Sequence, residues 1–152
     1  MIRLIYASTM SEDCTAKGLV DVFETAQREN AKRNVTGILC YDAGYFLQCL
    51  EGPRAEVNEV YCAIVSDPRH TRLEILDYAR TDARMFSAWS MAYMSASRVD
   101  ARIISTYCPS RRFAPYEMTP GGALQFLSDV VGTHRAIVEQ SVNPRATGPA
   151  SA

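Results

Sequence analysis

Two polar side chains that could do chemistry, Tyr6 and Gln48, fall inside apolar stretches that are expected to be β-strands. Gln48 shares a strand face with Phe46 and Leu50, and Tyr6 shares one with Leu4, because successive strand side chains alternate. A buried amide or phenol without a hydrogen-bond partner costs about 1–3 kcal/mol. If the two strands are neighbours, Tyr6 and Gln48 can satisfy each other, and such a buried pair is unusual in a plain apolar core.

Other candidates are weaker when each is taken alone. Arg69 and His70, in the loop 67–70, could donate hydrogen bonds to an anion such as phosphate, although a solvated loop has the same composition. Trp89 is the single tryptophan, and a lone strand tryptophan is usually part of the core. Asn30 closes a helical stretch, where asparagine is most often a C-cap. His134 has no visible partner and is expected to have no special role.

Hydrolytic and metal chemistry find no support in the sequence. No Ser-His-Asp arrangement can be argued, and GxSxG, HExxH and P-loop patterns are absent from the sequence. The five cysteines are odd in number and none has CxxC spacing, so neither a zinc site nor a disulfide framework is expected. We therefore expect no metal and no enzyme activity.

Length and charge narrow the class of protein. A chain of 152 residues suits one domain with a proper core. The net charge of -1 gives no electrostatic case for nucleic acid or an anionic membrane as a partner. Apolar runs are too short to span a bilayer, and the chain starts directly with strand-like residues, so neither a membrane anchor nor a leader is expected. These features predict a soluble cytoplasmic protein.

The elements that must position Tyr6 and Gln48 follow from hydrophobic periodicity. Alternating or continuous apolar runs predict five strands, and i, i+3, i+4, i+7 stripes predict two helices. Pro53 suits the first turn of the second helix, which should stop before Pro68. The order is βαββαββ, an α+β ferredoxin-like plan in which both helices cover one face of a mixed five-stranded sheet. The predicted segments are strand 2–7, helix 16–30, strands 35–41 and 45–51, a helix that begins at about Pro53 and stops before the loop 67–70, strand 73–77 and strand 86–94.

The hairpin strands are apolar on both faces, so a second layer must cover the far side of the sheet. Residues 96–140 are expected to form this helical cap, with a short helix at 101–107 and a longer one that starts at Thr119-Pro120. We divide the chain into a core of residues 1–95, the cap, and a disordered tail of residues 141–152.

Taken together, several segments resemble the BLUF family of flavin-binding blue-light sensors. The resemblance spans residues 2–94, at family order and spacing, and the chain looks like the short stand-alone members without an effector domain. Its strongest elements are the tyrosine, the glutamine and the Trp-Ser-Met run. The matching segments are Arg3-Leu4-Ile5-Tyr6-Ala7-Ser8, Gln27-Arg28-Glu29-Asn30, Val35-Thr36-Gly37-Ile38-Leu39, Phe46-Leu47-Gln48-Cys49-Leu50-Glu51-Gly52-Pro53, Asp67-Pro68-Arg69-His70 and Arg84-Met85-Phe86-Ser87-Ala88-Trp89-Ser90-Met91.

The resemblance implies a photochemical mechanism with FAD, or with FMN, as cofactor. Tyr6 would give an electron and then a proton to the excited flavin, and the Gln48 amide would rotate or tautomerise. The flavin would stay oxidised, with its absorption moved slightly to the red. The signal would pass through Met91 and Trp89 of the fifth strand to the C-terminal helices, and then to a partner protein or a change of homo-oligomer.

The resemblance also implies a set of flavin contacts. Asn30 would hydrogen-bond the flavin ring. Glu29 departs from the family, which often has histidine or asparagine there, and an ionised carboxylate near a flavin phosphate is unfavourable, so Glu29 is expected to point to solvent. The other implied contacts are Val22, Phe46 and Ile64 against the ring, and Asp67, Arg69 and His70 around the ribityl and phosphate portion.

Two other classes of function stay open at this point. A flavin-free ferredoxin-like module could be a small-molecule-binding regulator or an acylphosphatase-like hydrolase. The hydrolase would need a catalytic Arg–Asn pair or a phosphate-binding loop, and neither is evident after the first strand. A dark flavin redox enzyme would need an open substrate site beside the flavin.

Overall fold

A mixed β-sheet is the frame of the molecule, whose computed structural model describes residues 1–142, with side chains through residue 135. Within these residues the sheet has five strands in the order β4-β1-β3-β2-β5. Neighbouring strands are antiparallel except for the parallel pair β2–β5. The ferredoxin-like βαββαββ plan is therefore confirmed. The strands are β1 (Ile2–Met10), β2 (Thr36–Asp42), β3 (Tyr45–Gly52), β4 (His70–Arg80) and β5 (Ala92–Ser95).

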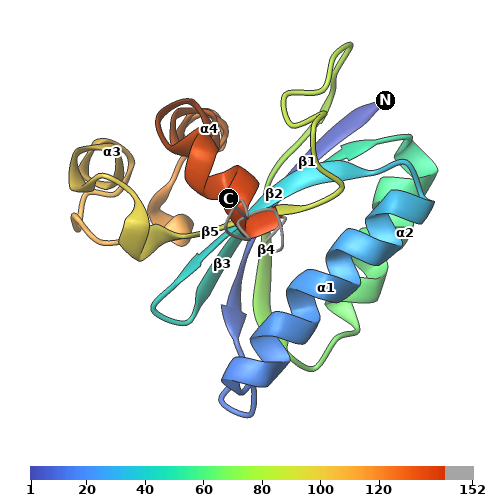
Figure 1. Cartoon of the computed structure of the whole chain (residues 1–152), viewed down its shortest axis with the longest axis horizontal. Coiled ribbons are helices and arrows are strands. Elements are labelled where there is room, and N and C mark those ends of the chain that lie inside the picture. The colour runs from blue at the N-terminus through green and yellow to red at the C-terminus, as the bar shows by residue number, and fades with distance from the viewer. Residues whose placement is uncertain (143–152) are drawn as a thin grey trace, which may run out of the picture.

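Two helices, α1 (Ala16–Lys32) and α2 (Arg54–Val65), cover one face of the sheet (Figure 1). Thr15 caps α1, because its side chain accepts a hydrogen bond from the Gly18 N–H at 3.1 Å. The buried stripe of α1 contains Val22 and Phe23, as its periodicity predicts. The pair of helices leaves a cleft above the centre of the sheet.

The C-terminal part of the chain covers the opposite face (Figure 1). It contains the turns η1 (Ala96–Arg98) and η2 (Pro115–Glu117) and the helices α3 (Ala101–Tyr107) and α4 (Pro120–Val142). Both predicted cap helices are thus present, and Thr119 accepts the Gly122 N–H as expected of an N-cap. Beyond its first two residues, the predicted tail 141–152 lies outside the described part of the chain.

Strand alternation divides the core into two layers, one on each side of the sheet. The helix-side layer lies under α1 and α2 and the cap-side layer lies under α3 and α4. Tyr6 of β1 faces the helix side while its neighbour Ile5 faces the cap side, and β3 alternates in the same way. Tyr6 lies directly opposite Gln48 in the β1–β3 register, which confirms that these two strands are neighbours.

The fifth strand is shorter than predicted. β5 comprises only Ala92–Ser95, and residues 86–91 follow an irregular path. The amide groups of Met85 and Phe86 donate to the buried carboxylate of Glu51 rather than to a neighbouring strand. The predicted strand over residues 86–94 is therefore confirmed for residues 92–94 and wrong for residues 86–91, where contacts with distant side chains such as Glu51 decide the path of the chain.

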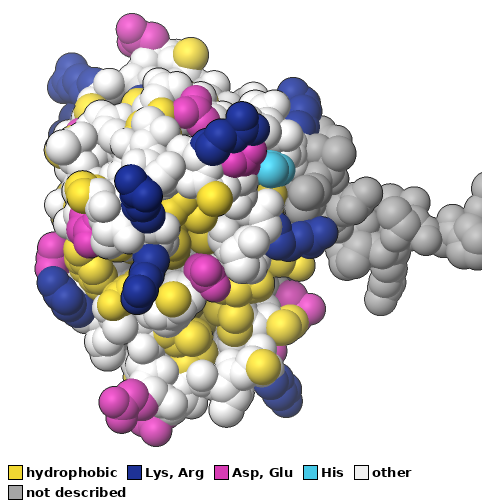
Figure 2. All heavy atoms as spheres, turned by 90° about the vertical axis from the view of Figure 1, so that its left-hand side faces the viewer, with side chains coloured by type: hydrophobic (Ala, Val, Ile, Leu, Met, Phe, Trp, Pro, Cys, Tyr) yellow, Lys and Arg dark blue, Asp and Glu magenta, His cyan; other side chains and the backbone are white. Residues whose placement is uncertain are grey.

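The surface of the cap side shows charges of both signs. Figure 2 looks onto this side, and lysine and arginine side chains are interspersed there with aspartate and glutamate, with apolar side chains between them. This face therefore presents no single-sign patch that would attract a polyanion. Among the described helices, none has the length and apolar character needed to cross a bilayer.

Candidate functional site

The centre of the site is a hydrogen-bonded pair of side chains in the helix-side layer. The Tyr6 hydroxyl donates to Gln48 Oε1, and Gln48 Nε2 donates to Met91 Sδ at 3.4 Å. All three residues are buried. Burial raises the pKa of Tyr6, and Tyr61 and Asp67 raise it further through charge repulsion. Tyr6 is therefore a neutral phenol at any ordinary pH, and it releases its proton only if it also loses an electron.

The two ends of the Gln48 amide are held unequally. Its oxygen accepts a full hydrogen bond from the Tyr6 phenol, whereas its nitrogen faces a thioether sulfur, which is a weak acceptor. Because an amide carries an acceptor on one side and donors on the other, rotation about its last bond exchanges what each neighbour receives. Rotation of the Gln48 amide breaks both bonds: the oxygen leaves the Tyr6 hydroxyl, and the nitrogen leaves Met91 Sδ and can donate to the Tyr6 oxygen instead.

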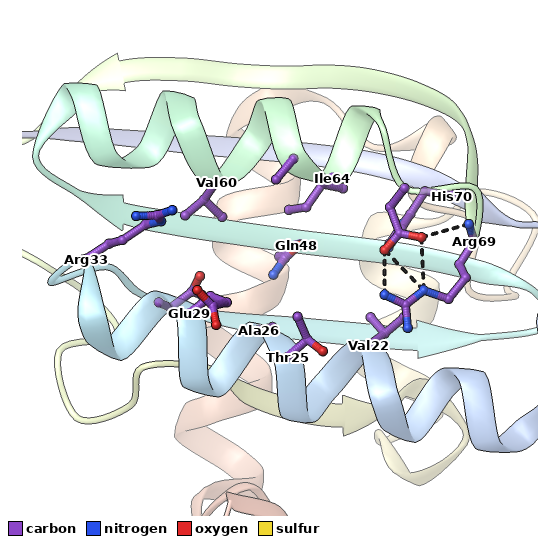
Figure 3. Close-up of a pocket in the computed structure, with 13 residues that line it drawn as sticks. Val22, Thr25, Ala26, Glu29, Arg33, Gln48, Val60, Ile64, Arg69 and His70 are labelled. Atoms are coloured by element: carbon purple, nitrogen blue, oxygen red, sulfur yellow. Dashed lines mark hydrogen bonds and ion pairs between the residues drawn. The ribbon is translucent and has the colours of Figure 1, made fainter.

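A cleft of about 190 Å³ lies between α1 and α2, directly over Gln48 (Figure 3). This volume is several times the ~30 Å³ that a water molecule occupies in the liquid, so the cleft has room for an organic ligand. Apolar side chains line its middle and polar ones its two ends. The lining residues are Val22, Thr25, Ala26, Glu29, Asn30, Arg33, Gln48, Val60, Ala63, Ile64, Asp67, Arg69 and His70.

Asn30 has an unpaired hydrogen-bond acceptor at this cleft. Its side-chain nitrogen donates to the Ser90 carbonyl at 3.1 Å, but its Oδ1 is buried without a hydrogen-bond partner among the described residues. A buried acceptor left unpaired costs about 1–3 kcal/mol, so a ligand that brings an N–H donor is favoured. The pyrimidine edge of a flavin carries an N–H between two carbonyls, and it fits this position.

Asn30 does not have the role that its place in the sequence indicated. Helix α1 continues past it to Lys32, and Arg33 is the C-cap. The C-cap interpretation was therefore wrong, because the helix ends two residues later than predicted. Asn30 is instead an interior helical residue, which aims its side chain at the sheet.

Arg69 lies at one end of the cleft (Figure 3), where it pairs with Asp67. The guanidinium of Arg69 contacts both carboxylate oxygens of Asp67 at 2.6–3.1 Å, and it also reaches the Gly18 carbonyl at 3.4 Å. These hydrogen bonds from Arg69 lower the pKa of Asp67. The two side chains largely satisfy each other, and their charges cancel.

His70 lies beside this pair but is buried more deeply. Its Nδ1 is 3.0 Å from the Ser8 hydroxyl, and its ring packs on Phe46 with a centroid distance of 4.8 Å. Burial lowers the pKa of His70 to about 4, so the ring is neutral at pH 7. Phe46 supports the ring of His70 and is not itself among the lining residues. Sequence reasoning missed Ser8, although it lies two residues after Tyr6 on the same strand face.

The structure brings Met91, but not Trp89, to Gln48. Met91 belongs to the helix-side layer, and its carbonyl accepts a hydrogen bond from the Gln27 side chain at 3.0 Å. Trp89 is 8% exposed and packs in the cap-side layer, on the other side of the sheet. The irregular path of residues 86–91 causes this separation. Gln27 was not predicted as a site residue, and no local pattern points to it.

Glu29 lies at the border of the cleft, with a side chain that is 37% exposed. It lines the cleft, and its carboxylate is ion-paired with Arg28 at 3.1 Å and Lys32 at 3.0 Å. These two cations neutralise the charge, which is why a carboxylate is tolerated at this position. The other lining residues that sequence reasoning did not assign to the site lie at helical spacing from Val22 and Ile64, and that spacing could have identified them: Thr25, Ala26, Arg33, Val60 and Ala63.

Comparisons with known proteins show what this chain is similar to. The family model described as "BLUF: Sensors of blue-light using FAD" matches residues 1–92. The chain is 41% identical over 93 residues to the blue light- and temperature-regulated antirepressor BluF of Escherichia coli K12, which covers 60% of this chain and 23% of that protein. It is 35% identical over 91 residues to the photoactivated adenylate cyclase subunit alpha of Euglena gracilis, covering 59% of this chain and 9% of that one. The chain thus spans less than a quarter of the length of these curated relatives.

Solved structures of similar chains match over most of their length. The photo-activated state of BlsA superposes with a TM-score of 0.76 at 26% identity, covering 86% of this chain and 94% of that one. The dark-state structure of BlrB, a BLUF protein, superposes with a TM-score of 0.64 at 27% identity, covering 91% and 96%. The similarity to these two structures extends past residue 92 into the cap.

Proposed function

This chain belongs to the BLUF family of blue-light sensors that use FAD, and from that premise we propose that Tyr6 and Gln48 form its light-operated switch. The protein is a flavin-binding blue-light photoreceptor. The observation that carries the proposal is the Gln48 amide, which faces the cleft and is held by Tyr6 on one side and only weakly by Met91 on the other. The flavin-free interpretations of the sequence are wrong for a member of this family.

Bound FAD supplies the absorption of blue light and, once excited, the capacity to take up one electron. With the cofactor bound, Tyr6 would supply that electron, and its proton would leave along the hydrogen bond that already points to Gln48 Oε1. The raised pKa of Tyr6, caused by its burial, keeps the phenol protonated until the electron departs. Electron and proton then return to Tyr6, so the cycle makes no net redox change.

After this cycle the Gln48 amide has different hydrogen-bond partners from those it had before. Rotation or tautomerisation of the amide gives Tyr6 and the ligand in the cleft a new set of donors and acceptors. The rearranged amide no longer donates to Met91 Sδ, because that bond requires the nitrogen to face the sulfur. The altered hydrogen bonds to the flavin account for a small red shift in its absorption.

Met91 is placed to pass this change towards the cap. It directly precedes β5, and its carbonyl and that of Ser90 accept hydrogen bonds from the α1 side chains Gln27 and Asn30. β5 leads through η1 to Asp100, whose N–H donates to Nε2 of His134 at 3.2 Å, where α4 is kinked. We propose residues 1–95 as the sensing core and 96–140 as the cap that carries the signal.

The output is proposed to be non-enzymatic in this chain and to act in the cytoplasm. A partner protein, or a change of homo-oligomer, would read the cap. Apolar side chains reach the surface on that side of the molecule, between charged ones (Figure 2). Such a mixed surface suits a reversible protein contact. A dark redox enzyme is not supported, because the cycle proposed for Tyr6 leaves no electron to deliver to a substrate.

A visible absorption spectrum before and after blue light tests this function. We expect the purified protein to be yellow, and its flavin bands to shift reversibly to the red. Tyr6→Phe should keep the flavin and lose the shift. Tyr61→Phe is the matched control. The Tyr61 ring packs edge-on against the Tyr6 ring, with 5.3 Å between the ring centroids, but it is Tyr6 that donates a hydrogen bond to Gln48. A colourless preparation that takes up no added flavin would refute the function, and a normal shift in Tyr6→Phe would refute the role of Tyr6.

A further inference from the structure

One residue of the cap, Tyr116 in η2, contacts three strands of the sheet. Its hydroxyl donates to the Arg72 carbonyl at 2.8 Å and lies 2.9 Å from Thr9 Oγ1. The centre of its ring is 4.3 Å from the Arg72 guanidinium carbon, and the ring packs edge-on against Tyr45, with 5.8 Å between the centroids. Tyr116 therefore joins the cap to β1, β3 and β4, and this connection does not pass through β5.

The contact with Arg72 lies on a bulge in β4. Thr9 pairs with Thr71 across the β1–β4 ladder. Two residues earlier in β1, Ala7 pairs with Glu74, which is three residues further along β4, so β4 holds one extra residue here. Arg72 has a φ of +48°, in the left-handed region that favours glycine. Among the described residues, Arg72 is the one non-glycine residue with positive φ that lies within a strand.

This bulge decides the direction in which His70 points. Side chains alternate along a regular strand, so residues an odd number of positions apart lie on opposite faces. His70 and Leu73 are three positions apart, yet His70 lines the cleft (Figure 3) and Leu73 packs against the helix-side layer. The extra residue in β4 reverses the alternation between them. An Arg72 that relaxed to an extended conformation would turn the His70 ring away from Ser8 and from the cleft.

The left-handed conformation of Arg72 needs contacts that hold it, because it is unfavourable for a residue with a side chain. Arg72 has no register partner in β1. Its ion pair with Glu74, at 3.3 Å, joins two exposed side chains and contributes little. Tyr116, by contrast, bonds the Arg72 backbone itself and also packs against its guanidinium.

We infer that Tyr116 holds the β4 bulge in its conformation, and that docking of the cap loop 108–119 on the sheet thereby sets the position of His70 in the cleft. Tyr116 is thus a positioning residue that acts through Arg72. The inference does not depend on which ligand the cleft binds. It gives the cap a second connection to the cleft, besides the one through Met91 and β5. Because such coupling is reciprocal, a change at His70 also alters how firmly the cap loop is docked.

Ionisation of His70 reports the position of its ring, and NMR titration of the full chain, kept in the dark, measures it. Burial lowers the pKa of His70 to about 4, while Asp67 raises it and Arg69 lowers it. The wild-type ring should therefore stay almost entirely neutral down to about pH 5. Tyr116→Phe removes the hydroxyl and keeps the ring, and it should raise the pKa of His70 towards 6.5 by at least about one pH unit. Since the chain has two histidines, His70→Gln assigns the signal.

Arg72→Gly separates loss of the bulge from general damage to the fold. Glycine adopts positive φ without strain, so the bulge in this variant needs no hydrogen bond from Tyr116. The double variant Tyr116→Phe/Arg72→Gly should therefore return the pKa of His70 to within about 0.5 of the wild-type value. Tyr45→Phe is the matched control, because it removes a hydroxyl from the ring that packs against Tyr116 and leaves the bond to Arg72 in place. It should leave the His70 titration unchanged.

An unchanged His70 titration in Tyr116→Phe would overturn the inference, and so would a raised pKa that Arg72→Gly does not reverse. An equal rise in Tyr45→Phe would overturn it too, because the effect would then not depend on the bond to Arg72. These outcomes leave the proposed function intact, since flavin binding and the red shift are measured separately.

Discussion

Two polar side chains of β3, only three residues apart, are buried on opposite faces of the sheet and are held in opposite ways. Glu51, on the cap side, accepts from Arg3 Nε at 2.9 Å and from the N–H groups of Met85 and Phe86 at 2.9 and 3.0 Å. Gln48, on the helix side, has one full bond, to Tyr6, and one weak contact with the sulfur of Met91. Glu51 has several strong partners, whereas Gln48 has a loosely held nitrogen beside a cleft.

We call Glu51 the anchor, because its hydrogen bonds hold it in one place, and Gln48 the switch, because its hydrogen bonds can be exchanged. A fully satisfied buried network has a single low-energy arrangement, whereas a partly satisfied one can have two of similar energy. The segment 84–91 connects the two sites. Arg84 and the Glu51 network fix its start, and hydrogen bonds from α1 and Gln48 hold its end at Met91. We therefore expect a change at Gln48 to move the end of the segment relative to its start.

Removal of the Glu51 carboxylate should lower the free energy of unfolding more than removal of the Gln48 amide. Glu51→Ala leaves Arg3, whose side chain is 13% exposed, and two backbone N–H groups without their acceptor, so we expect a loss of about 3–5 kcal/mol in the free energy of unfolding. Urea denaturation measures this loss. Glu74→Ala, an exposed carboxylate on β4, is the control and should change stability by less than about 0.5 kcal/mol. Equal losses in the two variants would show that Glu51 is no anchor.

A second prediction concerns pH and the helix side. Burial lowers the pKa of His70 from 6.5 to about 4, so the unfolded chain binds a proton at a higher pH than the folded one. Stability is therefore complete above pH 6.5 and falls as the pH drops towards 4, by up to about 3 kcal/mol. The urea concentration at the midpoint of unfolding, measured between pH 4 and pH 6.5, tests how steeply stability changes with pH. His70→Gln should flatten it, and an equally steep slope in that variant would assign the acid sensitivity elsewhere.

A third prediction separates two amides of α1 that hold adjacent carbonyls. Asn30 has an unpaired buried oxygen at the cleft, while Gln27 only holds the Met91 carbonyl. Asn30→Ala should weaken flavin binding by about tenfold, which corresponds to the loss of one buried hydrogen bond of about 1.4 kcal/mol. Gln27→Ala should weaken it by less than about threefold. Flavin release, followed by fluorescence, measures both, and the opposite order would contradict the fit of the flavin to Asn30.

The smallest predicted effect concerns the weak side of the switch. Met91→Leu removes the sulfur that accepts from Gln48 Nε2 and so destabilises the dark pairing by about 0.5–1 kcal/mol. Thermal recovery after a blue flash should slow by about two- to fivefold. Trp89→Phe, on the other face, should leave the recovery rate near that of wild type. Slower recovery in Trp89→Phe than in Met91→Leu would contradict the conclusion that Met91, and not Trp89, contacts Gln48.

Strand alternation and helical periodicity were enough to predict the centre of the site. They placed Tyr6 and Gln48 on one face and the two helices above them, because these patterns are local consequences of burial. They failed over residues 86–91, where the path depends on Glu51, a residue more than 30 positions away. They also could not show that Arg69 is occupied by Asp67 while Arg33 is loosely held, since the partner of a charge is a matter of three-dimensional distance.

The most direct test of the account compares Gln48 and Glu51 by light-minus-dark absorption. Gln48→Leu should bind flavin, stay yellow and give no reversible red shift, because leucine has no donor or acceptor to exchange. Glu51→Gln, which keeps an acceptor in the anchor, should give a red shift of wild-type size. A reversible red shift of wild-type size in Gln48→Leu would contradict the claim that the Gln48 amide is the switch.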